Sequence, residues 1–295
     1  MPHLATHFPA ERPAEALAEA GVSLAHLRGL PDLVIGEIAG RDSIAALVAV
    51  ARMRGPVTIL PTVVATGTEH GGEHSADDAV ARLRTQAGDT ADVLPIVRLA
   101  SPALWHALNG RFAAELASRY GSWSPCSACH LYVHLCRVPL AWAAGCRTVA
   151  TGERDAHGDR LKLSQTPETI DASIRAMAHA GIELLEPIRD VDDEATIAGL
   201  SGATRSDGVA QPSCVLSGNY VRTDGTIAFD AVRNTAYLTE FFGSAGRAIV
   251  DAWRAAGVGM DARAELPDYV SLVAGVLSEP RAGTDAGGSA GTTAR

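Results

Sequence analysis

Apolar and polar stretches alternate along most of the chain, with the lengths expected of strands and helices. Short apolar runs predict buried strands at 33–38, 57–65, 93–99, 148–151 and 182–185. Helical patterns occupy 13–27, 42–54, 77–86, 102–120, a stretch ending near 144, 167–180, 192–200 and 237–256. Because strand and helix follow each other in turn, we predict an α/β fold, a mostly parallel sheet with helices on both faces.

The same pattern divides the chain into four parts. Residues 1–30 predict a helical lead-in, and 31–200 carry the regular alternation of the main domain. Gly, Ser and Asp interrupt the rhythm after residue 200, so 201–279 is expected to be a C-terminal extension. Residues 280–295 are rich in Gly, Ala and Thr without periodicity and are expected to be a disordered tail.

Composition narrows the class of protein. Hydrophobic residues make up 47% of the 295 residues, which excludes a chain that is disordered throughout. The formal net charge of −9 is unfavourable for a nucleic-acid binder. No apolar run approaches the roughly 20 residues that cross a bilayer, and the N-terminal residues contain no apolar signal region. We therefore expect a cytoplasmic protein without a membrane partner.

Cys126 and Cys129 form a Cys-x-x-Cys pair, which is typical of metal, cluster or redox chemistry. The motif continues into His130 as in c-type haem attachment, but that use requires export. A thioredoxin-like dithiol would need a strand and helix context that is missing here. Two interpretations remain open. The pair and Cys214 either bind structural zinc together with a histidine or bind an iron–sulfur cluster; Cys136 and Cys146 are expected to be buried.

A glycine turn between a predicted strand and a predicted helix is the first candidate ligand site. The turn holds Gly40, Arg41, Asp42 and Ser43. The start of a helix presents free N–H groups and the positive end of the helix dipole, which together bind phosphate. Arg41 would add a cation and Ser43 a hydroxyl, although an ordinary capped turn would carry the same residue types.

The loop at 153–165 is the second candidate, because it follows a predicted central strand and open α/β sheets bind ligands there. Glu153 and Asp155 offer carboxylates for Mg²⁺. Lys162, the only lysine of the chain, would neutralise charge on a reacting phosphate.

The turn resembles the pyrophosphate-binding loop of the PP-loop ATP pyrophosphatases, whose pattern is Ser-Gly-Gly-x-Asp-Ser. Gly40, Asp42 and Ser43 match it, Arg41 stands where many members have lysine, and Ile-Ala replaces the first Ser-Gly. The segment 149–155 is similar to the family's Ala-Thr-Gly-His motif, with Glu153 in place of His. The segment 184–190 resembles its later Arg-Pro-Leu segment, with the arginine displaced. The resemblance covers about residues 32–200 and implies a PP-loop (HUP-like) fold, similar to the adenine nucleotide alpha hydrolases.

One branch of that family is the [4Fe–4S]-dependent tRNA thiolation enzymes. Its members have Cys-x-x-Cys after the third strand and a lone cysteine far downstream, and the three cysteines hold a cluster with one open iron. Cys126, Cys129 and Cys214 follow the same order. The resemblance therefore implies that these three residues bind a [4Fe–4S] cluster, with Zn²⁺ as the alternative, and that Cys129 also takes part in catalysis.

The implied function is an ATP-dependent sulfurtransferase that adenylates a carbonyl oxygen, releases pyrophosphate and installs sulfur. The turn 40–43 would bind the pyrophosphate end of ATP and Ala65 would meet its adenosine. Gly152, Glu153, Asp155 and Lys162 would surround the α-phosphate and Mg²⁺. Expected partners are a sulfur donor, a second copy of the chain, and a small-molecule or carrier-bound substrate or tRNA, the last disfavoured by the net charge. The alternatives are a zinc-containing amide or nitrile ligase and a non-catalytic nucleotide or metal sensor.

Overall fold

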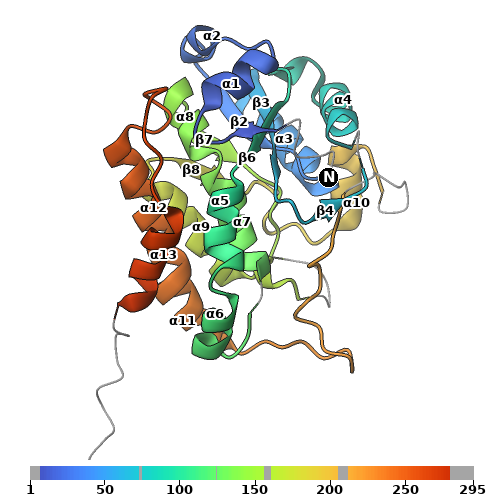
Figure 1. The fold of residues 1–295 in the computed structure, drawn as a ribbon. Coiled ribbons are helices and arrows are strands. Elements are labelled where there is room, and N and C mark those ends of the chain that lie inside the picture. Colours follow the sequence, from blue (N-terminus) through green and yellow to red (C-terminus); the bar gives the residue numbers. More distant parts are fainter. Residues whose placement is uncertain (1–6, 73–74, 124, 156–160, 205–211, 280–295) are drawn as a thin grey trace, which may run out of the picture.

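The computed structural model describes residues 7–72, 75–123, 125–155, 161–204 and 212–279. Its centre is a sheet of seven parallel strands, which runs through the middle of Figure 1. The strands are β1 (Phe8–Pro9), β2 (Leu33–Glu37), β3 (Val57–Ala65), β5 (Ala91–Val93), β6 (Val97–Ala100), β7 (Thr148–Ala150) and β8 (Glu183–Leu185). Their order is β1–β6–β3–β2–β7–β8, with β5 also beside β3. The strands β3, β5 and β6, which follow β2 in the sequence, lie on one side of it, and the later strands β7 and β8 lie on the other side.

Helices cover both faces of this sheet (Figure 1), as the alternating pattern predicted. One face is packed by α3 (Arg41–Arg54), α4 (Ser75–Ala87) and α10 (Glu194–Ser201). The other core includes residues of α1 (Pro13–Glu19), α2 (Leu24–Arg28), α5 (Pro102–Trp105), α6 (Ala113–Tyr120), α7 (Pro125–Leu135), α8 (Val138–Ala144), α9 (Pro167–His179), α12 (Gly243–Ala256) and α13 (Tyr269–Ser278). The α/β fold class is confirmed.

Two prolines explain how the sheet departs from the pattern. The single strand expected at 93–99 is wrong, because Pro95 separates β5 from β6. Both short strands pair with β3, β5 with Val57–Ile59 and β6 with Thr62–Ala65. Pro61 of β3 falls in the gap between these two pairings. The N–H group that Pro61 lacks is therefore not needed for a hydrogen bond to β5 or β6. As a result, β3 stays continuous over the range predicted for it.

Three predicted helices are each divided. The lead-in at 13–27 is two helices, α1 and α2, because the chain turns at Gly21 with a φ of 70°. The long helix expected at 102–120 widens into a π-helical turn at His106–Gly110 and resumes as α6 after Phe112. The helix expected at 237–256 is present as a π-helical segment, Tyr237–Phe242, followed by α12, and α11 (Ala231–Ala236) precedes it.

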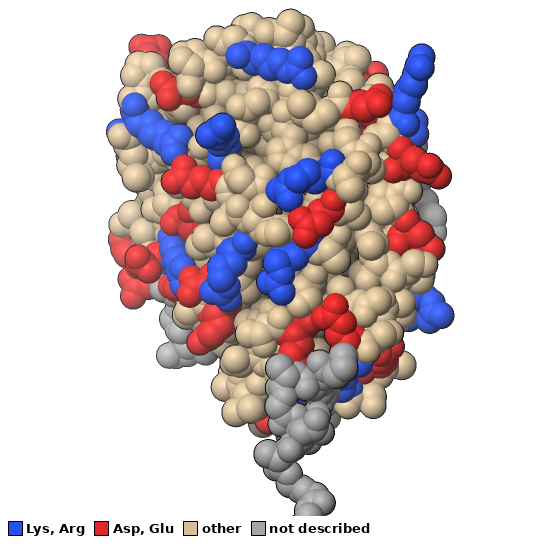
Figure 2. Space-filling model, turned by 90° about the vertical axis from the view of Figure 1, so that its left-hand side faces the viewer, with Lys and Arg blue, Asp and Glu red and all other residues tan. Residues whose placement is uncertain are grey.

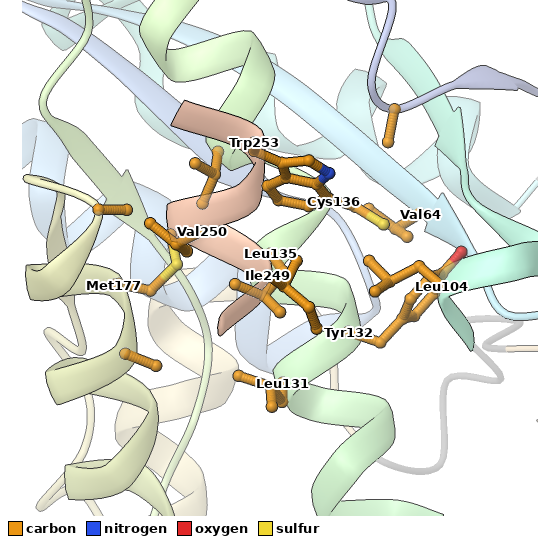
Figure 3. Packing of buried hydrophobic residues seen from close by; sticks show 14 of the residues in the cluster. Val64, Leu104, Leu131, Tyr132, Leu135, Cys136, Met177, Ile249, Val250 and Trp253 are labelled. Atoms are coloured by element: carbon orange, nitrogen blue, oxygen red, sulfur yellow. The ribbon is translucent and has the colours of Figure 1, made fainter. Parts of the chain in front are cut away.

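The helices after residue 242 complete the same core as the N-terminal segment. Figure 3 shows Trp253 of α12 packed over Cys136 and Val250, close to the side chains of α7. The Trp253 indole N–H donates to the hydroxyl of Tyr269 at 2.8 Å, and that hydroxyl donates to Glu11 at 2.6 Å. This chain of hydrogen bonds ties α12 and α13 to the start of the chain.

Replacing Trp253 by alanine is expected to lower the free energy of unfolding by about 3–5 kcal/mol. The side chain is fully buried, so the change removes its packing and leaves a cavity. Urea unfolding followed by circular dichroism measures the loss. Met260→Ala, at a side chain that is 66% exposed, is the control and should change the free energy by less than about 0.5 kcal/mol. Equal losses in the two variants would contradict the central position of Trp253.

Charges are mixed on the face shown in Figure 2, where Lys and Arg side chains lie among Asp and Glu side chains. A continuous basic surface of the kind that binds nucleic acid is therefore not formed on that face. Among the residues that the structure describes, no helix is long and apolar enough to cross a membrane. The tail expected at 280–295 lies outside the described residues.

Candidate functional site

A cavity of about 610 Å³ opens at the carboxyl ends of the central strands. Its wall includes residues within three positions of the ends of β2, β3 and β7, among them Gly40, Thr66 and Gly152. The strand order reverses between β2 and β7, and open parallel sheets bind ligands at such a reversal. The volume lies within the range of about 300–1,000 Å³ that is usual for small-molecule sites.

The glycine turn predicted from the sequence forms one wall of this cavity. Residues Ala39 to Ser43 all line it, and α3 begins at Arg41. The Ser43 hydroxyl accepts hydrogen bonds from the backbone N–H groups of Ala39 and Gly40 at 3.0 and 3.1 Å and donates to the Gly40 carbonyl at 2.7 Å. Ser43 therefore braces the turn from within, and the first N–H groups of α3 remain available for an anion.

Ion pairs fix the charged side chains of the turn. Arg41 pairs with Asp42 at 3.1 Å and with Glu194 of α10 at 2.7 Å. Arg154, which is 1% exposed, bridges the same two carboxylates at 3.2 and 3.1 Å. The four side chains form a network that holds the start of α3 against α10 and against the segment after β7.

Gly152 touches the start of α3 through its backbone. A Cβ atom at this position would lie 2.4 Å from the Ser43 nitrogen and 2.6 Å from the carbonyl carbon of Asp42. Real Cβ atoms do not approach backbone that closely. Only glycine lets the end of β7 and the glycine turn share this wall of the cavity.

Cys126 and Cys129 line the cavity from the first two turns of α7. The start of a helix favours the thiolate form of a cysteine. Burial acts in the opposite direction and, with a smaller contribution from negative charge on Glu69, Cys126 and Cys214, raises the pKa of Cys129 to about 12. A metal bound here would therefore have to displace a proton from the Cys129 thiol.

Cys214 reaches the cavity by a short two-stranded antiparallel sheet, β4 (Glu69–His70) with β9 (Ser213–Cys214). The sulfur of Cys214 lies 3.3 Å from the Thr68 hydroxyl, just after β3, and accepts a hydrogen bond from the Leu216 N–H at 3.4 Å. The cavity is thus lined by all three cysteines expected to act together. Cys136 and Cys146 are buried elsewhere, 0% and 7% exposed, which confirms their expected role in packing.

The other predicted site residues divide between the cavity wall and its surroundings. Glu153 and Lys162 line the cavity, and the Lys162 ammonium donates to the side-chain amide oxygen of Gln165 at 3.0 Å. Asp155 is not among the lining residues that the structure describes; its carboxylate pairs with Arg189 at 2.8 Å. Ala65 is also absent from that described lining, and Thr66 and Thr68 take its place after β3.

The sequence interpretation missed Glu37, the last residue of β2, which is 9% exposed and lines the cavity. Its carboxylate lies 3.6 Å from the guanidinium of the buried Arg137. Burial raises the pKa of Glu37, and Arg137 opposes that effect. A carboxylate inside an otherwise apolar strand was the signal available in the sequence, because a buried charge without a partner is costly.

Two histidines of α7 face Glu153. The His130 Nδ1 atom lies 2.5 Å from Glu153 Oε1, and the His134 Nε2 atom lies 3.7 Å from the same oxygen. Burial alone would lower the pKa of His130 and raise that of Glu153. Their mutual attraction and hydrogen bond, together with charges and hydrogen bonds from neighbouring groups, reverse both effects, so the pKa of His130 is raised and that of Glu153 is lowered. Burial lowers the pKa of His134 to about 3, so its ring is neutral near pH 7.

The comparisons with known proteins identify a relative but no activity. No model of a known protein family matches the chain. An uncharacterized protein of the archaeon Methanocaldococcus jannaschii, MJ0009, is 34% identical over 215 residues. That alignment covers 72% of this chain and 77% of the archaeal protein. At this identity and coverage, the chain belongs to the same protein family as MJ0009.

Proposed function

We propose that the protein is an ATP-dependent sulfurtransferase of the PP-loop type. In the first step a substrate carbonyl oxygen bonds to the α-phosphorus of ATP as the bond to pyrophosphate breaks. In the second step sulfide attacks the activated carbon and AMP leaves with the oxygen, so C=O becomes C=S. The observation that carries the proposal is that one cavity is lined by both the glycine turn and the three cysteines.

The spacing of the cysteines favours a cluster over a single zinc ion. Three sulfurs around one zinc at about 2.3 Å would lie about 3.8 Å apart. Among the described residues, one group of three metal-ligating side chains has all its donor atoms within 4.8 Å of one another, and it consists of His130, His134 and Glu153. The three cysteine sulfurs do not form such a group, so at least two of them lie farther apart than that. A cluster of four irons holds its thiolates farther apart than one ion does.

The chain's own groups have defined roles in this proposal. The first N–H groups of α3 and the Arg41 guanidinium bind the pyrophosphate end of ATP. Lys162 neutralises charge on the α-phosphate. Cys126, Cys129 and Cys214 hold the cluster, with donors from Thr68 and Leu216 near the Cys214 sulfur. Bound by three thiolates, a [4Fe–4S] cluster supplies an open iron on which sulfur can be delivered.

Anaerobic purification followed by iron, sulfide and zinc analysis tests the proposal, together with calorimetric titration of MgATP. The expected result is a brown protein with about four irons and four sulfides per chain that also binds MgATP. One zinc per chain without iron would overturn sulfur transfer in favour of the ligase alternative. Iron without any binding of MgATP would overturn the nucleotide chemistry.

Arg41→Gln is expected to weaken MgATP binding by about 10- to 100-fold, because it removes one charged hydrogen-bond donor to a phosphate. Iron content should stay at the wild-type level, since Arg41 belongs to α3 and the two paired cysteines belong to α7. Calorimetry measures the affinity and iron analysis the cluster. Arg54→Gln is the matched control: it removes an arginine from the last turn of the same helix, where it pairs with Glu183. Equal affinities in the two variants would rule out phosphate binding by Arg41.

A further inference from the structure

A second set of metal-ligating side chains lies beside the same cavity, and two of its three members, His130 and Glu153, line it. His130 and His134 lie one turn apart on α7, so their rings project from one face of that helix. Glu153 follows β7 on the opposite side. The donor atoms of all three side chains lie within 4.8 Å of one another. Two imidazoles and one carboxylate converge from two separate elements.

The distances suit an ion of small radius. Ligands about 2.0–2.2 Å from a metal in tetrahedral geometry lie about 3.3–3.6 Å from each other. The His134 Nε2 atom is already 3.7 Å from Glu153 Oε1, and His130 Nδ1 is 2.5 Å from that oxygen. Separating His130 Nδ1 from Glu153 Oε1 by about 1 Å more would bring that pair to the spacing that an ion requires, and all three donor atoms already lie within 4.8 Å of one another.

His134 supplies an independent reason to expect a ligand. Its side chain is 1% exposed, and neither ring nitrogen has a hydrogen-bond partner among the described residues. Buried polar atoms without partners are rare in folded proteins because they cost stability. A metal ion bound to Nε2 would satisfy one of these atoms.

Glu153 is oriented so that one of its oxygens faces the histidines. The Gln165 amide donates to Glu153 Oε2 at 2.5 Å, while Oε1 faces His130 and His134. Hydrogen bonds of this kind fix the direction of a metal ligand. Lys162 in turn donates to the other end of the Gln165 amide.

We propose that His130, His134 and Glu153 bind one divalent transition-metal ion of the class that accepts imidazole, such as Zn²⁺ or Fe²⁺. Mg²⁺ is disfavoured because it prefers oxygen ligands. Three protein ligands leave a coordination position open, as in catalytic sites. Because His130 and Glu153 line the cavity, that position faces bound substrate and takes an oxygen of a phosphate or carbonyl group. The site does not depend on the proposed ATP chemistry.

Titration with Co²⁺ of the full chain carrying Cys126→Ser, Cys129→Ser and Cys214→Ser tests this site. Cobalt bound to thiolates gives an intense near-ultraviolet charge-transfer band, whereas His and Glu ligands give only weak visible bands. The expected result is one Co²⁺ per chain with visible bands and no thiolate band. Adding His134→Gln should weaken binding at least about 100-fold, since it removes a direct ligand. His26→Gln, at an exposed histidine of α2, is the control and should bind as tightly as the parent.

A second measurement uses chains with all cysteines present, in case the triple variant does not fold. His134→Gln and Glu153→Gln should each contain one equivalent less zinc than the wild type after purification with added zinc, and the same iron. Circular dichroism confirms that each variant is folded. Unchanged zinc in both variants, or Co²⁺ bound with equal affinity after His134→Gln, would overturn the site without affecting the case for sulfur transfer.

Discussion

Gly152→Ala is expected to weaken MgATP binding by at least about 100-fold. The added Cβ would lie 2.4 Å from the Ser43 nitrogen, and the nearest atoms are all backbone, so no side chain can rotate away. The end of β7 and the start of α3 must then move apart. A displacement of about 1 Å at a site of this kind costs about 100-fold in function, and overpacking costs about 1–3 kcal/mol in stability. Calorimetric titration with MgATP and urea unfolding measure the two effects.

Gly199→Ala is the matched control for that variant. Gly199 lies in α10, and a Cβ atom there would meet nothing within 4 Å. We expect wild-type affinity and a stability equal to or up to about 1 kcal/mol above that of the wild type, because alanine is the better helix former. If Gly152→Ala bound MgATP as well as Gly199→Ala, the glycine turn and β7 would not share a nucleotide site.

Cys214→Ala is expected to remove most of the iron, from about four atoms per chain to fewer than about one. The reason is that the variant leaves two thiolates, both on one helix, to hold a cluster expected to need three protein ligands. Binding of MgATP should change less than about twofold, since the glycine turn keeps its own contacts. Anaerobic iron and sulfide analysis and the visible absorption spectrum measure the loss.

Cys136→Ala is the control for this second variant. Cys136 is fully buried in the core beneath Trp253 (Figure 3) and not in the cavity wall. It should keep its iron and lose only about 1 kcal/mol of stability, the loss expected for a small cavity. Full iron content in Cys214→Ala would show that this cysteine is not a ligand, however close it lies to the other two.

Local sequence patterns predicted the strands and helices whose position depends on the residues within them. The apolar runs before the glycine turn and after Gly55 became β2 and β3, and the polar start of α3 lies within one residue of its expected position. The errors have named causes. Pro95 divides one strand, Gly21 divides one helix, and a π-helical turn at His106–Gly110 divides another. The apolar helix α13 was not predicted either.

The site was harder to predict because it depends on contacts between distant segments. No periodicity reveals strands of two residues, yet β4 and β9 bring Cys214 to the cavity. Order in the sequence suggested the three cysteines, whereas their shared cavity comes only from the fold. Asp155 shows the opposite case: its position after β7 suggested a role at phosphate, but Arg189 occupies its carboxylate. The amino-acid sequence alone cannot tell a predicted site residue that reaches the cavity, such as Cys214, from one that pairs with another side chain, such as Asp155.

The bond between Glu11 and Tyr269 has a consequence for biosynthesis. The two residues are 258 positions apart, and Glu11 also accepts a hydrogen bond from Ser101 at 2.5 Å. Until α13 leaves the ribosome, a nascent chain exposes the core surface around Cys136 and has no Tyr269 partner for the Glu11 carboxylate. The core that the N-terminal segment begins can therefore be completed only after α13 has been synthesised, and its apolar surface is available to chaperones until then.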